Sequence, residues 1–124
     1  IAAVTSALAA VPAGRRFLML SHAGDRSDED IAGLVEGAFA LHPDVVVAAE
    51  MEHYLRGRRP GEVPGLIAAR SRELGGDRVM VSVAPSPAAG AQSIIGALQP
   101  GDLALLLVHD ERDRIFAMLS AAEG

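Results

Sequence analysis

Four short apolar runs, each followed by a segment with helical periodicity, constrain the fold of this chain more than any other feature. Each run has the length of a buried strand, and the three consecutive valines of the second suit a strand covered on both faces. Strict alternation of strand and helix predicts a mostly parallel sheet with right-handed crossovers and helices on both faces. The expected strands are Phe17–Leu20, Asp44–Ala49, Arg78–Val83 and Leu103–Val108.

The segments between these runs carry the apolar spacing of amphipathic helices. After the first run, Ser27 can cap a helix whose first turn is acidic, and an apolar stripe begins at Ile31. Pro87 follows Ser86 at a position where proline is tolerated because its missing N–H would be unpaired there. The expected helices are Ala2–Ala10, Ser27 to about His42, Glu62–Leu74, Pro87–Leu98 and a last helix that opens between His109 and Arg114.

These elements predict one α/β domain of three layers, a Rossmann-like fold with strand order 3-2-1-4. The chain has 124 residues, the size of a single domain, and no internal repeat or linker. We expect the fourth strand to be central because it is the most apolar. The order reverses between strands one and four, so a ligand crevice is expected at the carboxyl ends of those strands.

Composition excludes several classes of function. Half of the residues are apolar and few are aromatic, which indicates an aliphatic core, and the lack of cysteine excludes disulfides and thiolate metal sites. All eleven basic residues are arginine, and a Walker-type phosphate loop requires lysine. The net charge of −5 argues against a nucleic-acid partner. Neither a membrane span nor a signal peptide is recognisable, so we expect a cytoplasmic protein with no membrane partner.

Polar residues cluster in the loops that follow the strands. Gly24, Asp25 and Arg26 form either a ligand loop or an ordinary turn with a surface ion pair. Arginine binds carboxylate and phosphate bidentately, so the arginines of the long loop Glu50–Gly61 are either an anion clamp or a solvated basic stretch. The candidate residues are His22, Asp25 and Arg26 after the first strand, Arg56, Arg58 and Arg59 after the second, and His109 and Asp110 after the fourth.

Two histidines flank the expected crevice. His22 and His109 could hold a metal ion together with Asp25 and Asp110 if the loops converge, but the spacing matches no metal motif and no metal site is expected. Glu50 and Glu52 are expected to face solvent. No nucleophile elbow or Ser-His-Asp spacing is present. The residues alone therefore indicate a small doubly wound domain that binds an anion-bearing ligand.

Three motifs in order resemble the C-terminal domain of the Mur ligase family, over nearly the whole chain. They are GDRSDEDI at Gly24–Ile31, LRGR at Leu55–Arg58, and the run Ala88–Leu107 with AQSIIGAL and PGDLALLL. The form of the first two motifs is most similar to the cyanophycin synthetase branch. Val108-His109-Asp110 stands where peptidoglycan-precursor ligases carry Gly-Lys-Gly, a departure that favours the cyanophycin branch over a muramyl-peptide substrate.

The resemblance implies an ATP-dependent carboxylate–amine ligase that works through an acyl phosphate. Within this family, cyanophycin synthetases join arginine to the side chain of aspartate in a polymer, and a related branch joins preformed aspartyl-arginine dipeptides. ATP and Mg²⁺ would be bound mainly by a central domain upstream, which would be the partner of this C-terminal domain and close against it. The chain begins with Ile rather than Met, in keeping with a fragment of a larger ligase. By itself the domain is expected to be inactive, with no catalytic residue of its own.

The resemblance implies that Arg56, which matches the arginine of the second motif, binds the carboxylate of the incoming amino acid. It places Asp25 and Arg26 in the loop that faces the closed site, and His109 and Asp110 where further substrate contacts lie. His22 joins this set from the first strand. The alternative is a stand-alone Rossmann-like module that binds a small anion without catalysis. The sequence leaves open which amino acid is added, what accepts it, and whether the protein forms a homo-oligomer.

Overall fold

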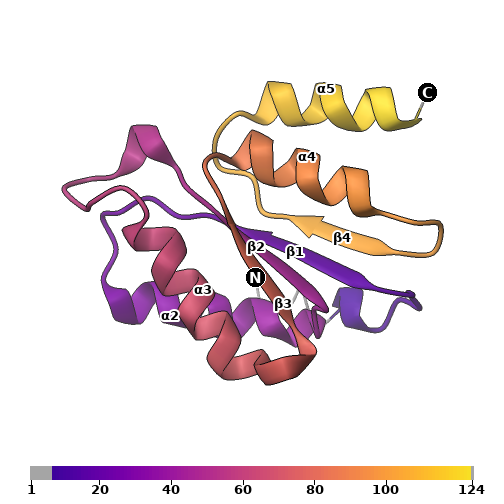
Figure 1. Cartoon of the computed structure of the whole chain (residues 1–124), viewed down its shortest axis with the longest axis horizontal. Helices are drawn as coiled ribbons and strands as arrows, with labels where there is room; N and C mark the ends of the chain where they lie inside the picture. The colour runs from indigo at the N-terminus through magenta and orange to yellow at the C-terminus, as the bar shows by residue number, and fades with distance from the viewer. Residues whose placement is uncertain (1–6, 124) are drawn as a thin grey trace.

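A parallel sheet of four strands organises the computed structural model, which describes residues 7–123. The strand order is β3-β2-β1-β4 (Figure 1), so the predicted α/β class, parallel arrangement and order are confirmed. β1 lies between β2 and β4, with Leu18 opposite both Val46 and Leu105. The strands are β1 Arg16–Leu20, β2 Val45–Ala49, β3 Met80–Ala84 and β4 Leu103–Leu106.

The helices begin where the sequence supplies caps. The Ser27 side chain accepts a hydrogen bond from the Asp30 amide, and Ser86 does the same for Ala89, directly before Pro87. Residues 7–9 are helical, and the rest of the predicted helix Ala2–Ala10 lies largely outside the described residues. No helix within residues 7–123 combines the length and apolar character needed to cross a membrane. The helices are α2 Asp28–Ala38, α3 Glu62–Gly75, α4 Pro87–Ala97 and α5 Arg112–Glu123.

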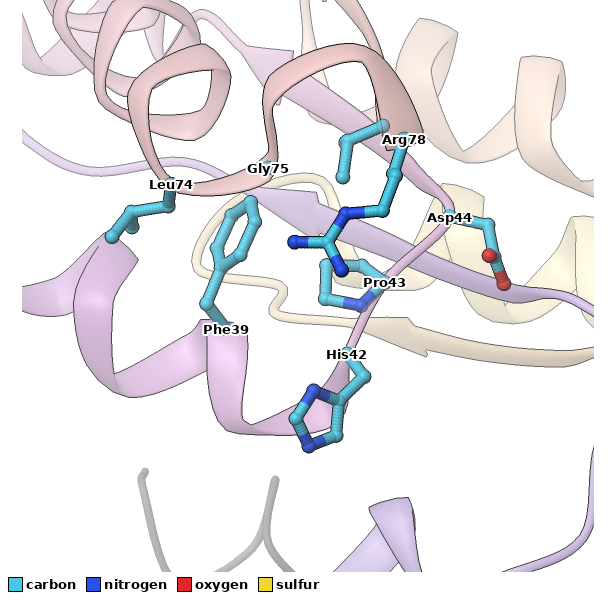
Figure 2. A pocket seen from close by; sticks show the side chains of 8 residues that line it. Phe39, His42, Pro43, Asp44, Leu74, Gly75 and Arg78 are labelled. Carbon is cyan, nitrogen blue, oxygen red and sulfur yellow. The ribbon is translucent and has the colours of Figure 1, made fainter.

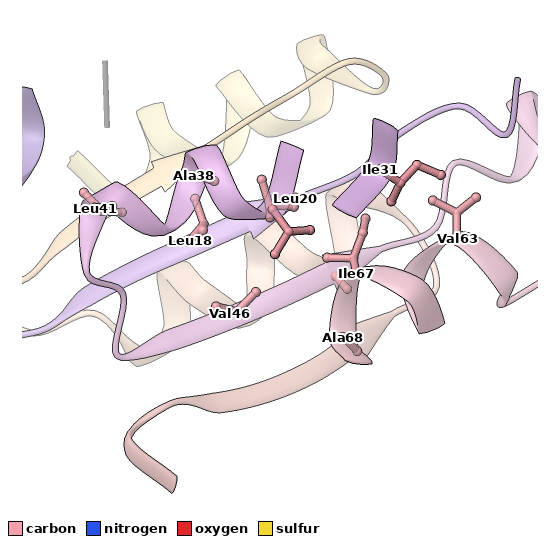
Figure 3. Close-up of a cluster of buried hydrophobic side chains, with 11 residues drawn as sticks. Leu18, Leu20, Ile31, Ala38, Leu41, Val46, Val63, Ile67 and Ala68 are labelled. Atoms are coloured by element: carbon pink, nitrogen blue, oxygen red, sulfur yellow. The ribbon is translucent and has the colours of Figure 1, made fainter. Parts of the chain in front are cut away.

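Two aliphatic cores fill the space between the sheet and its helices, because neighbouring side chains of a strand point to opposite faces. Leu18 and Leu20 of β1 belong to the core beneath α2 and α3 (Figure 3), where Ile31 and Ile67 meet them. Phe17 and Met19 belong to the other core, beneath α4 and α5. Every apolar side chain of β1 is therefore buried, and the strand anchors both layers.

The expectation that the fourth strand is central is wrong. Among the described residues only β1 pairs with β4, and the side chains of β4 are half-buried, whereas β1 and β2 lie inside the sheet. An apolar sequence indicates that both faces of a strand are covered. It does not indicate whether both edges of the strand pair with other strands. The start of β4 is tied to β1 by Asp102, whose carboxylate accepts hydrogen bonds from the Arg15 amide and guanidinium. These bonds lower the pKa of Asp102, and the bond from the Arg15 guanidinium has the largest effect.

Candidate functional site

His22 and His109 meet at the carboxyl edge of the sheet. Their ring centroids are 6.2 Å apart and the rings are tilted by 54°. The contact follows from topology, because His22 comes two residues after the end of β1 and His109 comes after β4, its neighbour. His22 Nδ1 lies 2.9 Å from the Ala23 carbonyl, which holds the proton on that nitrogen. The predicted convergence of the two histidines is confirmed.

His109 is the titratable group that the crevice perturbs most clearly. Partial desolvation of its ring lowers its pKa from the ordinary value of 6.5, although the residue as a whole remains exposed. The charges of His22 and Arg112 lower this pKa further. The imidazole is therefore biased towards its neutral form, which can accept a hydrogen bond. A shallow hollow of about 370 Å³, lined by residues 109–114, opens beside it.

The loops that carry the two motifs touch through Gly24. Its amide donates a hydrogen bond to the Tyr54 carbonyl over 2.8 Å. A Cβ atom at this position would lie 1.9 Å from the Leu55 carbonyl oxygen, far inside van der Waals contact. Only glycine allows the loop after β2 to approach the loop after β1 this closely.

Arg58 locks the same two loops together. Its Nε donates to the Gly24 carbonyl over 3.0 Å, and its Nη2 donates to the Arg26 carbonyl over 2.6 Å. Nη1 forms ion pairs with Glu62 and, over 2.8 Å, with Asp28, and these two carboxylates raise the pKa of Arg58. The side chain is only 14% exposed. Its donors are occupied within the fold, so Arg58 positions the crevice and is not the anion clamp.

Arg56 remains free to meet a ligand. It is exposed, it has a left-handed backbone with φ of 53°, and its guanidinium carbon lies 5.4 Å from the centre of the Tyr54 ring. Asp25 and Arg26 are also exposed, on the loop that Arg58 holds. Five of the six predicted site residues thus lie on the joined motif loops or in the histidine contact. Arg58 and Gly24 join the loop that carries Arg56 to the loop that carries Asp25 and Arg26, and the pairing of β1 with β4 brings His22 to His109.

Asp110 bonds its neighbour Glu111, and Glu111 bonds the start of α4. The Asp110 carboxylate accepts from the Glu111 amide over 2.9 Å. Glu111 follows the fourth strand in the sequence, but its role was not predicted: its carboxylate accepts hydrogen bonds from the Ala88 amide over 3.0 Å and from the Arg114 side chain. The first turn of α4 is therefore satisfied by Ser86 and Glu111. No local sequence pattern predicts this contact, because Glu111 and Ala88 are 23 positions apart in the sequence.

Glu50 corrects a second expectation. It was expected to face solvent, but it is only 8% exposed, and its carboxylate accepts from the Gly61 amide over 2.8 Å. It follows β2 directly, so its side chain turns back into the long loop and closes it. Ser21, also missed, is completely buried before His22, and within the described residues its hydroxyl has no hydrogen-bond partner. Its position directly after a central strand is the signal that could have identified it.

The described residues offer little to a nucleotide phosphate or a metal ion. Asp28, Glu29 and Asp30 crowd the first turn of α2 with negative charge, which opposes phosphate at that helix end. No group of three or more histidine or acidic side chains within residues 7–123 is arranged to hold a metal.

A cavity of about 350 Å³ lies at the amino ends of β2 and β3, away from the motifs. Figure 2 shows Phe39, Pro43 and Leu74 around it, together with the side chain of Arg78. These residues precede β2 and β3, whereas ligands of open α/β sheets bind beyond the carboxyl ends of the strands. We therefore place the candidate site at the carboxyl ends of β1 and β4, where His22 and His109 meet, and call it the histidine crevice.

The chain matches no family model, and a search of curated proteins found no match. The fold and the crevice define a Rossmann-like α/β domain with a polar site at its topological switch point.

Gly24→Ala should lower the free energy of unfolding by about 1 to 3 kcal/mol, because the new methyl group must push the Leu55 carbonyl away. Urea denaturation measures the change. Gly33→Ala is the matched control, since nothing lies within 4 Å of its Cβ position in α2 and alanine favours a helix. Equal stability of the wild type and Gly24→Ala would show that the two loops do not pack as described.

His22→Gln should raise the pKa of His109 towards its ordinary value, because it removes one of the charges that disfavour the imidazolium. Burial remains, so recovery should be partial. NMR titration of the histidine ring protons measures it, with His42→Gln, at the opposite edge, as the control. Since the pKa of His109 is lower in the folded state, stability should decline as pH falls from 6.5 through the folded pKa and then level off. An unchanged titration of His109 would contradict the coupling.

Proposed function

We propose that this chain is the C-terminal, substrate-binding and closing domain of an ATP-dependent carboxylate–amine ligase. It most resembles the cyanophycin synthetase branch of the Mur ligases, which join arginine or aspartyl-arginine to an aspartate-containing polymer. The domain would act as part of a longer enzyme whose central domain lies upstream, and would be inactive alone. Since such a ligase consumes ATP, we place it in the cytoplasm.

The observation that carries this proposal is the physical union of the two motif loops. GDRSDEDI and LRGR are separated in the sequence, yet three contacts join their loops: the Gly24 amide donates to the Tyr54 carbonyl, Gly24 packs against the Leu55 carbonyl, and the Arg58 side chain donates to the Gly24 carbonyl. The motif residues Gly24 and Arg58 thus have a geometric reason to occur together, whichever ligand the crevice takes. The arrangement leaves Arg56 and Asp25 exposed.

Within this proposal Arg56 binds the carboxylate of the incoming amino acid. Its planar guanidinium can donate two parallel hydrogen bonds to a carboxylate, and none of its own donors is used by an ion pair among the described residues. The exposed Asp25 carboxylate suits a cationic substrate such as arginine. Neutral His109 and the neighbouring His22 and Asp110 would add hydrogen bonds at the far side of the crevice.

ATP and Mg²⁺ do not fit the residues present. The chain has no lysine, the start of α2 is acidic, and the start of α4 is already capped. We therefore assign both to the central domain and route no chemical step through this chain. Its contribution would be to orient the amino acid and to exclude water when the domains close.

A stand-alone anion-binding module is the second candidate. It is favoured by the gathering of His22, His109 and Arg112 at one end of the crevice. The parent gene distinguishes the two. A glycine-rich loop ending in Gly-Lys-Ser or Gly-Lys-Thr upstream supports the ligase, and a start codon close to Ile1 supports the module.

Calorimetric titration of ATP-Mg²⁺ into the isolated chain should show only feeble binding. Acidic residues at the start of α2 repel phosphate, and no lysine is available to neutralise it. An affinity in the low micromolar range would contradict the assignment of ATP to another domain and favour the anion-binding module.

In the full-length enzyme, Arg56→Ala should raise the KM for the incoming amino acid and leave the fold intact. Loss of a bidentate contact to a charged group costs about 2 to 4 kcal/mol, or about 30- to 1,000-fold in kcat/KM. Steady-state kinetics measure the loss. Arg56→Lys should restore only part of it, because an ammonium group lacks the planar fork.

Two neighbours serve as controls. Arg59→Ala should be nearly silent, since Arg59 is exposed and no contact of its side chain joins the two loops. Arg58→Ala should instead lower stability, because its bonds hold the crevice together. If Arg59→Ala impaired binding and Arg56→Ala did not, the alignment of the second motif would be out of register.

A further inference from the structure

Within residues 7–123, β4 has one backbone edge that pairs with no strand. The amides of Leu103 and Leu107 donate to carbonyls of β1 and of the residue before it, so the odd-numbered residues of this segment turn towards β1. Backbone groups of successive strand residues point to opposite sides, which turns the N–H and C=O groups of Ala104 and Leu106 outward. No other strand within residues 7–123 meets them. This edge can accept one extended strand.

The edge also lacks the features that normally prevent pairing. The segment LALLLV, residues 103–108, contains no charge and no proline, whereas exposed edges usually carry charged side chains, proline or a bulge. Its side chains alternate between the two cores, so both faces of the strand are apolar. A strand that extends the sheet here must itself be apolar on both faces.

An apolar groove and an apolar projection lie beside this edge. The groove, about 350 Å³, runs between α4, β4 and α5 and is lined by Ile94, Leu98, Leu106 and Ile115. At its lip Phe116 is 59% exposed and Leu119 is 36% exposed, both on α5. Figure 1 shows α5 next to α4, and β4 is the sheet strand nearest to this helix pair. One surface therefore carries both a hollow and a side chain able to fill it.

We propose that a second copy of this chain covers β4, through antiparallel pairing of the two β4 strands. A two-fold axis at Leu105 would set Ala104 opposite Leu106 of the second copy and make four backbone hydrogen bonds. It would also bring the two α5 helices together on one face of a continuous sheet. Phe116 of each copy would then enter the groove of the other.

Self-complementarity favours a second copy over an unrelated partner. In a two-fold interface each surface must carry both halves of every contact. β4 does so, since the same strand supplies donors, acceptors and two apolar faces, and α5 supplies the projection beside the hollow. The second free edge, β3, begins after Asp77 and Arg78 and has the polar Ser82 at its centre, so it offers no matching apolar strand.

A dimer through this surface would need to bury an area of standard size. A standard interface takes about 800 Å² from each partner, roughly an eighth of the 6776 Å² that this chain exposes. A short strand alone does not supply this area. β4, the groove and the twelve residues of α5 form one contiguous surface that extends along a helix about 18 Å long. The proposal does not depend on the ligase function.

Sedimentation velocity of the chain over a wide range of concentration tests the proposal. The expected result is a reversible doubling of the 12.8 kDa mass. Ala104→Pro removes an outward amide without touching a bond to β1 and should yield a monomer. Phe116→Glu, at an exposed position that should not affect folding, should also yield a monomer.

Val83→Pro is the matched control on the other edge. Met80 donates to the residue before β2, so Val83 has its amide on the free side of β3, and the variant should still form the dimer. Circular dichroism checks that each variant is folded; if Ala104→Pro is not, Phe116→Glu decides. A monomer at every concentration, a dimer that Phe116→Glu retains, or a dimer lost only in Val83→Pro would overturn the proposal.

Discussion

Burial of β1 on both faces and both edges is the constraint on which the rest of this domain depends. Phe17 and Met19 supply one core, Leu18 and Leu20 supply the other, and β2 and β4 hydrogen-bond to the two edges. A strand held in this way cannot shift in register without exchanging the side chains of the two cores. The position of its carboxyl end, and therefore of His22 and the loop that follows, is set by the packing of the whole molecule.

The two loops at that end are held together by hydrogen bonds and close packing. Arg58 binds two carbonyls of the first loop, Gly24 accepts close contact with the second, and Glu50 holds the amide of Gly61. These bonds use side chains that a sequence inspection would assign to ligand binding or to solvent. Arg56 and Asp25 lie on these joined loops and remain exposed. That division between positioning and exposed groups is what a preorganised binding site requires.

Sequence reasoning predicted the parallel sheet, its order and the meeting of the two histidines. It succeeded because hydrophobic runs report strands and because right-handed crossovers leave few topologies. It failed where a residue's role depends on distant partners. Arg56, Arg58 and Arg59 look equivalent in the sequence, yet Arg58 alone reaches carbonyls more than thirty residues away. β4 was expected inside the sheet because its apolar pattern describes its faces and carries no information about its outer edge.

The sequence by itself determined the elements, since caps at Ser27 and Ser86 and alternating apolar periods act within a few residues. It also determined what the chain lacks, lysine and cysteine, and so which chemistry is closed to it. Only the tertiary structure decided which arginine is exposed, that Glu50 is buried, and that no strand within residues 7–123 pairs with the outer edge of β4. The physical reason is that hydrogen bonding and burial of a side chain are set by residues brought close in space, and these come from separate loops and strands.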